Sequence, residues 1–180
     1  MTPHARLRRI RIWLVLFIIC LILSGVTAFP LLTEVRWVDG LLREAWSPAP
    51  QALVDFIGEV RRGLEAANQD YPFLAYGTDW LAFAHLVIAA AYWGPLRDPV
   101  RNLWVIHWGM FCCVAVIPLA LIAAPTRGLP WWWIPIDCSF GVVGIIPLLV
   151  VRRHTLALAA TVTDPAPAPV PAPAAAPTAG

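Results

Sequence analysis

The apolar residues of this chain gather into four long blocks separated by short polar breaks. The blocks cover residues 12–29, 78–96, 98–124 and 130–151. An α-helix rises about 1.5 Å per residue, so about 20 residues cross a hydrocarbon core of about 30 Å. The pattern predicts an all-α polytopic membrane protein with four transmembrane helices.

Helix-breaking and capping residues predict where these blocks begin and end. A basic N-terminal segment, residues 1–11, precedes the first block, whose apolar run is longer than that of a typical signal peptide, so an uncleaved anchor is expected. Thr78 is the expected N-cap of the second block, and Gly94-Pro95 ends it. Asp98-Pro99 is expected to start the third block, which stops before Pro125.

The segment between the first two blocks, residues 30–77, predicts two amphipathic helices. Residues 32–46 and 51–68 each carry one apolar face, and Ser47-Pro48-Ala49-Pro50 separates them. Such helices cover the end of the bundle, lie on the outer leaflet, or dock a partner. We favour the cover over the bundle, because connections usually pack on the elements that they connect.

Composition narrows the class of protein. Of 180 residues, 59% are hydrophobic and only 13% are charged, which is too apolar for an ordinary soluble domain. The net charge is only +2, and no basic tract indicates nucleic-acid binding. The expected surroundings are therefore a lipid bilayer and, in one interpretation, other membrane-protein subunits.

The arginines predict the orientation. Short cytoplasmic loops are enriched in positive charge. Four arginines precede the first block, two flank the turn between the second and third, and two follow the fourth, whereas the loop between the third and fourth holds only Arg127. Both termini are therefore expected in the cytoplasm, with the protein in a bacterial inner membrane. The Ala- and Pro-rich stretch 155–180 is expected to be a disordered cytoplasmic tail.

Ionisable residues at membrane depth are the natural candidates for function, because they are costly there. The candidate polar cluster is Asp79, His85, Asp137 and Ser139. Asp79 is most simply a first-turn acid that complements the helix dipole. His85 and Asp137 are expected at a shared depth of about 9–10 Å from the outer surface, where they either lock two helices together or form a ligand or proton-relay site. Arg97, Asp98 and Arg101 form a candidate cytoplasmic turn.

Two histidines in apolar blocks raise the alternative of a haem b site. His85 and His107 are expected on the order of 12 Å apart along the membrane normal, which disfavours one iron held by both. No cofactor is therefore predicted. The two adjacent cysteines, Cys112 and Cys113, do not form a CxxC motif, so no metal site is predicted either.

Three runs of sequence resemble a family of short four-helix bacterial integral membrane proteins. They are residues 71–85, 98–105 and 136–141, within a likeness that covers roughly residues 8–153. The resemblance implies that these runs belong to one recurring module, in which Asp79, His85, Arg101 and Asp137 are the most chemically active residues. It implies no particular activity.

Function is predicted only in outline. The sequence contains no phosphate loop, nucleophile elbow or HExxH motif, so an enzyme is not expected. The favoured interpretation is a structural or accessory subunit of a larger respiratory or photosynthetic membrane assembly. The alternatives are a small transporter or proton-coupled carrier that uses Asp137 and His85, and a haem-binding redox protein.

Overall fold

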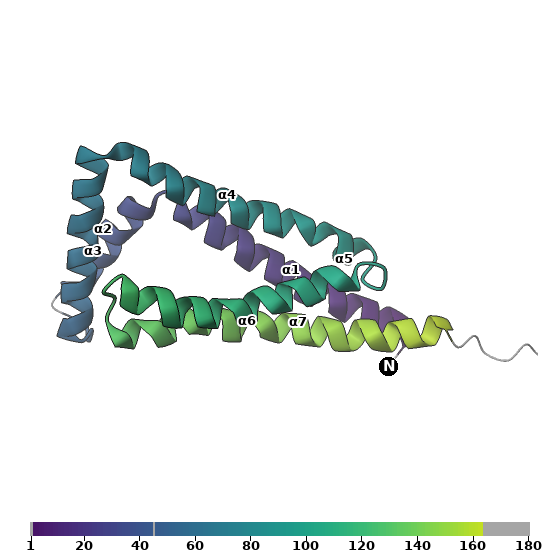
Figure 1. Cartoon of the computed structure of the whole chain (residues 1–180). Coiled ribbons are helices and arrows are strands. Elements are labelled where there is room, and N and C mark those ends of the chain that lie inside the picture. The colour runs from purple at the N-terminus through teal and green to yellow at the C-terminus, as the bar shows by residue number, and fades with distance from the viewer. Residues whose placement is uncertain (1, 45, 164–180) are drawn as a thin grey trace, which may run out of the picture.

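A computed structural model describes residues 2–44 and 46–163 (Figure 1). Within these residues the chain is all-helical, and four helical stretches are long and apolar enough to span a membrane. The elements are listed here in chain order: α1 Pro3–Ala28, α2 Leu31–Leu42, α3 Gln51–Asp70, the 3₁₀ turn η1 Pro72–Leu74, α4 Ala75–Ala91, α5 Trp93–Arg97, α6 Leu103–Thr126, the 3₁₀ turn η2 Trp131–Trp133 and α7 Ile134–Thr163.

The four long helices form two arms that meet at one end of the molecule and spread apart at the other (Figure 1). One arm is the pair α1 and α4, and the other is the pair α6 and α7. Because α1 packs on α7 as well as on α4, it joins the two arms. We call the end where the arms meet the closed end and the other the open end.

Buried apolar side chains hold the closed end together. They come from both arms and form one cluster: Ile10, Leu14, Tyr92, Val105, Ile106, Leu148 and Val151. The ring of Phe17 packs edge-on against that of Tyr92, with 4.9 Å between the centroids. The Arg152 Nε–H also donates a 3.0 Å hydrogen bond to His107 Nε2, which ties α6 to α7 near this cluster. His107, which is exposed, therefore links α6 to α7 through a hydrogen bond.

At the open end, α3 lies across the long axis of the arms (Figure 1). Its last residues lead into η1 and α4, and near its start the Phe56 ring contacts the rings of Trp132 and Trp133, with centroids 5.4 and 5.0 Å away. The second amphipathic helix thus occupies the position of the expected cover. It connects the two arms where they are farthest apart.

Ion pairs hold α2 against α3. Asp39, which is only 4% exposed, lies 2.9 Å from Arg43 Nε and 3.0 Å from Arg61 Nε. The hydrogen bond from Arg43 and the positive charge of both arginines lower the pKa of the Asp39 carboxyl group. Glu65 pairs with Arg36 across the same interface, at 2.8 Å. These ion pairs therefore fix α2 and α3 relative to each other.

Several predicted boundaries are wrong. The second long helix begins at Ala75, and Thr78 does not cap it, because its hydroxyl donates to the Ala75 carbonyl within the helix. Pro72 starts the preceding turn instead. Asp98 accepts a 3.0 Å hydrogen bond from the Arg101 N–H and so stabilises a turn, after which α6 begins only at Leu103.

The first and last long helices extend beyond their predicted limits. α1 starts at Pro3, because Thr2 caps the helix and the arginines of the expected N-terminal segment continue it. α7 runs to Thr163, past the predicted end at residue 151, since Thr155 is buried and Leu158 packs on the closed-end cluster. Residues 155–163 are thus helical rather than disordered. The rest of the predicted tail, 164–180, lies outside the described residues.

Candidate functional site

A cavity of about 1010 Å³ lies between the two arms. Its walls come from α1 on one side and from α6 and α7 on the other, with one residue from α4. Most of the lining is apolar, such as Phe17, Leu119 and Phe140. The cavity exists because α1 and α4 diverge from α6 and α7 between the closed-end cluster and the open end, which leaves space that side chains do not fill.

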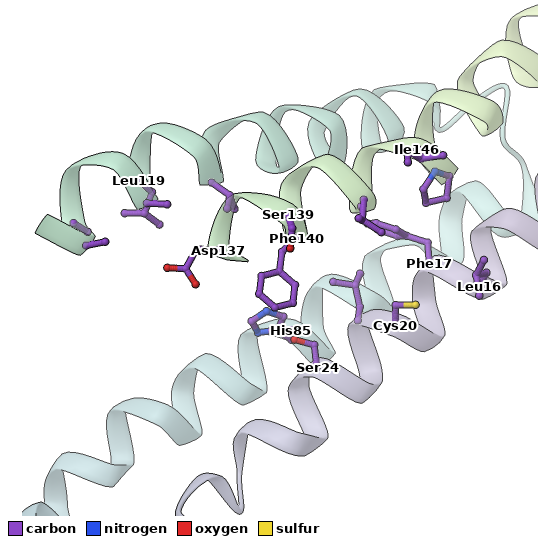
Figure 2. A pocket seen from close by; sticks show the side chains of 18 of the residues that line it. Leu16, Phe17, Cys20, Ser24, His85, Leu119, Asp137, Ser139, Phe140 and Ile146 are labelled. Atoms are coloured by element: carbon purple, nitrogen blue, oxygen red, sulfur yellow. The ribbon is translucent and has the colours of Figure 1, made fainter. Parts of the chain in front are cut away.

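Three of the four residues of the predicted polar cluster line this cavity. Figure 2 shows His85 on α4, and Asp137 and Ser139 near the start of α7. Asp79 does not line it. Asp79 is also not a first-turn acid, because α4 begins at Ala75 and Asp79 is its fifth residue.

His85 and Asp137 lie on opposite sides of the cavity (Figure 2). Their side chains project from opposite walls of the cavity (Figure 2), and no hydrogen bond or ion pair joins them in the described part of the chain. Both residues line the same cavity because both arms face it, and no interaction between the two side chains is needed for this. Of the two alternatives, the helix lock requires a hydrogen bond between these side chains, whereas a ligand site requires only that both line one cavity.

A close contact between α1 and α4 positions His85. Gly25 of α1 is buried against α4, where an added Cβ would lie 2.9 Å from the Ala82 carbonyl oxygen and 3.1 Å from His85 Cβ. Only glycine lets the two backbones approach this closely. The ring is then oriented by a 2.8 Å hydrogen bond between His85 Nδ1 and the Leu81 carbonyl oxygen.

Asp137 and Ser139 occupy the beginning of α7. Asp137 lies in the first helical turn, where the helix dipole favours a negative charge. The Ser139 hydroxyl donates a 2.6 Å hydrogen bond to the Ile136 carbonyl oxygen. Within the described residues, the Asp137 carboxylate has no hydrogen-bonding or ionic partner.

Sequence reasoning missed three polar or polarisable residues of the lining: Cys20 and Ser24 on α1, and Arg127 after α6. Cys20 and Ser24 are small residues within an apolar block, and they look like ordinary lipid-facing positions. The spacing of four residues between them, which places both on one face of α1, is the only signal that the sequence offers.

The remaining candidates lie elsewhere. Arg97, Asp98 and Arg101 are at the closed end, where Arg97 stacks 5.6 Å from the centroid of the Trp93 ring. His107 is bonded to Arg152, so His85 and His107 belong to different parts of the bundle. In the described chain, no group of three His, Cys, Asp or Glu residues is placed to hold a metal ion.

Comparisons with known proteins do not assign the site. No protein-family model, curated protein or solved structure matches this chain. The resemblance to short four-helix membrane proteins stays a prediction.

Proposed function

We propose that this chain is a multi-pass protein of a bacterial inner membrane, with both termini in the cytoplasm, that binds a small amphiphilic molecule in the cavity between its arms. The membrane location is supported by the four long helices, whose surfaces expose many large apolar side chains. Phe111, Leu121 and Ile122, for example, do not line the cavity and are 66, 56 and 68% exposed. Such surfaces are stable against lipid and unfavourable in water.

The observation that carries the binding proposal is that His85 and Asp137, from different arms, line one largely apolar cavity. Small-molecule sites are typically about 300–1,000 Å³, with apolar walls and a few polar groups that fix the orientation of the ligand. This cavity, at about 1010 Å³, has the size of such a site and a similar combination of apolar walls and a few polar groups. An amphiphile fits it because the walls contact an apolar body and the two ionisable groups contact a polar head.

A proton-coupled carrier and an accessory subunit remain predictions, and they differ in what they require of the cavity. A proton-coupled carrier that uses Asp137 and His85 requires the same binding step, and the closed-end cluster would seal such a cavity at one end. An accessory role in a larger assembly requires a partner surface and does not require an occupied cavity. Filling the cavity distinguishes these cases.

A cavity-filling variant tests the proposal. Ala123 lines the cavity, whereas Val114 lies on the same helix, is 52% exposed and does not line it. We expect Ala123→Trp to reduce binding of twelve-carbon amphiphiles roughly tenfold or more, because the indole occupies the space that they need. Val114→Trp is expected to bind like the wild type. Native mass spectrometry of protein released from a non-ionic detergent counts the bound molecules.

Equal occupancy of the two variants would contradict the proposal, since it would place the amphiphile on the outer surface of the helices. Because both variants place a tryptophan on α6, the comparison controls for a general effect of adding this residue.

A further inference from the structure

We propose that the polar head of the ligand is an ammonium group with N–H donors, carried on an apolar body. This inference rests on the proposed binding function and concerns the same cavity. It follows from what His85, Asp137 and Ser139 have left to offer after their hydrogen bonds within the protein are made. Ser24 of α1 also lines the cavity, and its hydroxyl can either donate or accept.

His85 offers a lone pair. Its Nδ1 is 2.8 Å from the Leu81 carbonyl oxygen, and a carbonyl oxygen only accepts hydrogen bonds, so Nδ1 carries the proton. In the neutral ring Nε2 is then an acceptor. A group that meets this nitrogen in the cavity must bring its own proton.

Ser139 and Asp137 offer acceptors as well. The Ser139 proton is committed to the Ile136 carbonyl oxygen, which leaves the oxygen lone pairs. An ionised Asp137 carboxylate has only acceptors, and within the described residues it has no partner. The three side chains of the predicted cluster that line the cavity therefore present acceptors and no free donor.

Charge makes an ammonium group a better match than a hydroxyl. A carboxylate in a mostly apolar cavity is costly unless a positive charge or several donors meet it. A primary or secondary ammonium group supplies both the charge and two or three N–H donors. Asp137 would accept one, and Ser139 or His85 Nε2 another.

Arg127 is the competing source of positive charge. It also lines the cavity, on the loop after α6, and it is exposed. Within the described chain it forms no ion pair with Asp137. If its guanidinium group turned inward it would neutralise Asp137 and favour a neutral or anionic ligand, so the experiment includes a variant at this residue.

Three probes of equal chain length test the inference: dodecylamine, dodecan-1-ol and dodecanoate. At pH 7 the amine is protonated, as lysine is with its pKa near 10.4. We expect the full-length protein in non-ionic detergent to bind dodecylamine roughly tenfold or more tighter than dodecan-1-ol, measured by native mass spectrometry. Asp137→Asn, which keeps the shape of the side chain but removes its charge, is expected to weaken dodecylamine binding roughly tenfold and so to remove this preference.

Asp79→Asn is the matched control, because Asp79 is also an acid near the start of a long helix but does not line the cavity. The inference is overturned if the amine binds no more tightly than the alcohol, or if Asp79→Asn removes the preference as fully as Asp137→Asn. A preference for dodecanoate that Arg127→Gln abolishes would assign an anionic ligand instead. In each of these cases the proposed function stands, whereas binding of none of the three probes would contradict the proposed function itself.

Discussion

Close contacts at single small residues decide how the helices of this protein approach one another. Gly141 of α7 is buried against the Cys113 carbonyl oxygen of α6, and a Cβ at this position would overlap that oxygen. Gly144, one turn later, faces the Cys113 Sγ atom. The two glycines give α7 a smooth surface on which the backbone of α6 packs, which is the usual means of close helix contact in membranes.

Gly141→Ala is therefore expected to destabilise the protein by about 1–3 kcal/mol, because the added methyl group meets backbone that cannot turn away. Gly77→Ala is the control, since an added Cβ there has nothing within 4 Å. Unfolding in mixed micelles with increasing denaturing detergent measures both. Equal stability of Gly141→Ala and the wild type would show that α6 and α7 are not packed this closely.

At the same scale, counting residues relates positions along a helix but not positions across the bundle. Counting residues along each helix placed His85 and Asp137 at one height, and both do line one cavity. The count does not give the sideways distance between helices, which depends on how α1 packs against α4 and α7. For this reason the sequence left open whether the two residues touch, and it gave no sign that Ser24 of α1 lines the same cavity.

Among the elements, α3 links the two arms. Its apolar face was evident from the sequence, but its contact with η2 was not, because the two segments are far apart in the chain and no pattern relates them. In the structure the Phe56 ring contacts Trp132 and Trp133. Helix ends were also predicted less well than helices, since Thr78 and Asp98 both make local hydrogen bonds that do not start a long helix.

Removal of the Phe56 ring is expected to free the start of α3 from η2. Aromatic pairs contribute about 0.5–1.5 kcal/mol each beyond their burial, so Phe56→Ala should raise hydrogen exchange in residues 51–60 roughly tenfold. Residues of α2 should change little, because the ion pairs of Asp39 remain. Phe73→Ala, at a side chain 71% exposed, is the control. Unchanged exchange after Phe56→Ala would mean that other contacts hold α3 in place.

For the molecule as a whole, the sequence predicted four long apolar helices and their order, and the structure has them. It did not predict two arms that separate at one end. Long apolar blocks carry little directional information, since their apolar residues surround the helix instead of marking one face. The divergence of the arms follows from where bulky side chains pack, at the closed-end cluster, and from the span of α3 across the open end.

The distribution of arginines predicts the orientation of the molecule in the membrane. Arg97 lies at the closed end, which also holds the start of α1, and Arg127 follows α6 at the open end (Figure 1). Eight of the 13 arginines lie in the first turns of α1, in and just after α5, and in the second half of α7, and such an excess marks the cytoplasmic side. We therefore expect Arg127→Cys to react with a membrane-impermeant maleimide in intact cells, and Arg97→Cys to react only after permeabilisation. Arg62→Cys, on α3, should react like Arg127→Cys, and the wild-type chain measures the background from its own cysteines. Labelling of positions 97 and 127 from the same side would mean that α6 does not cross the bilayer. The proposal that the cavity lies between two membrane-spanning arms would then be wrong.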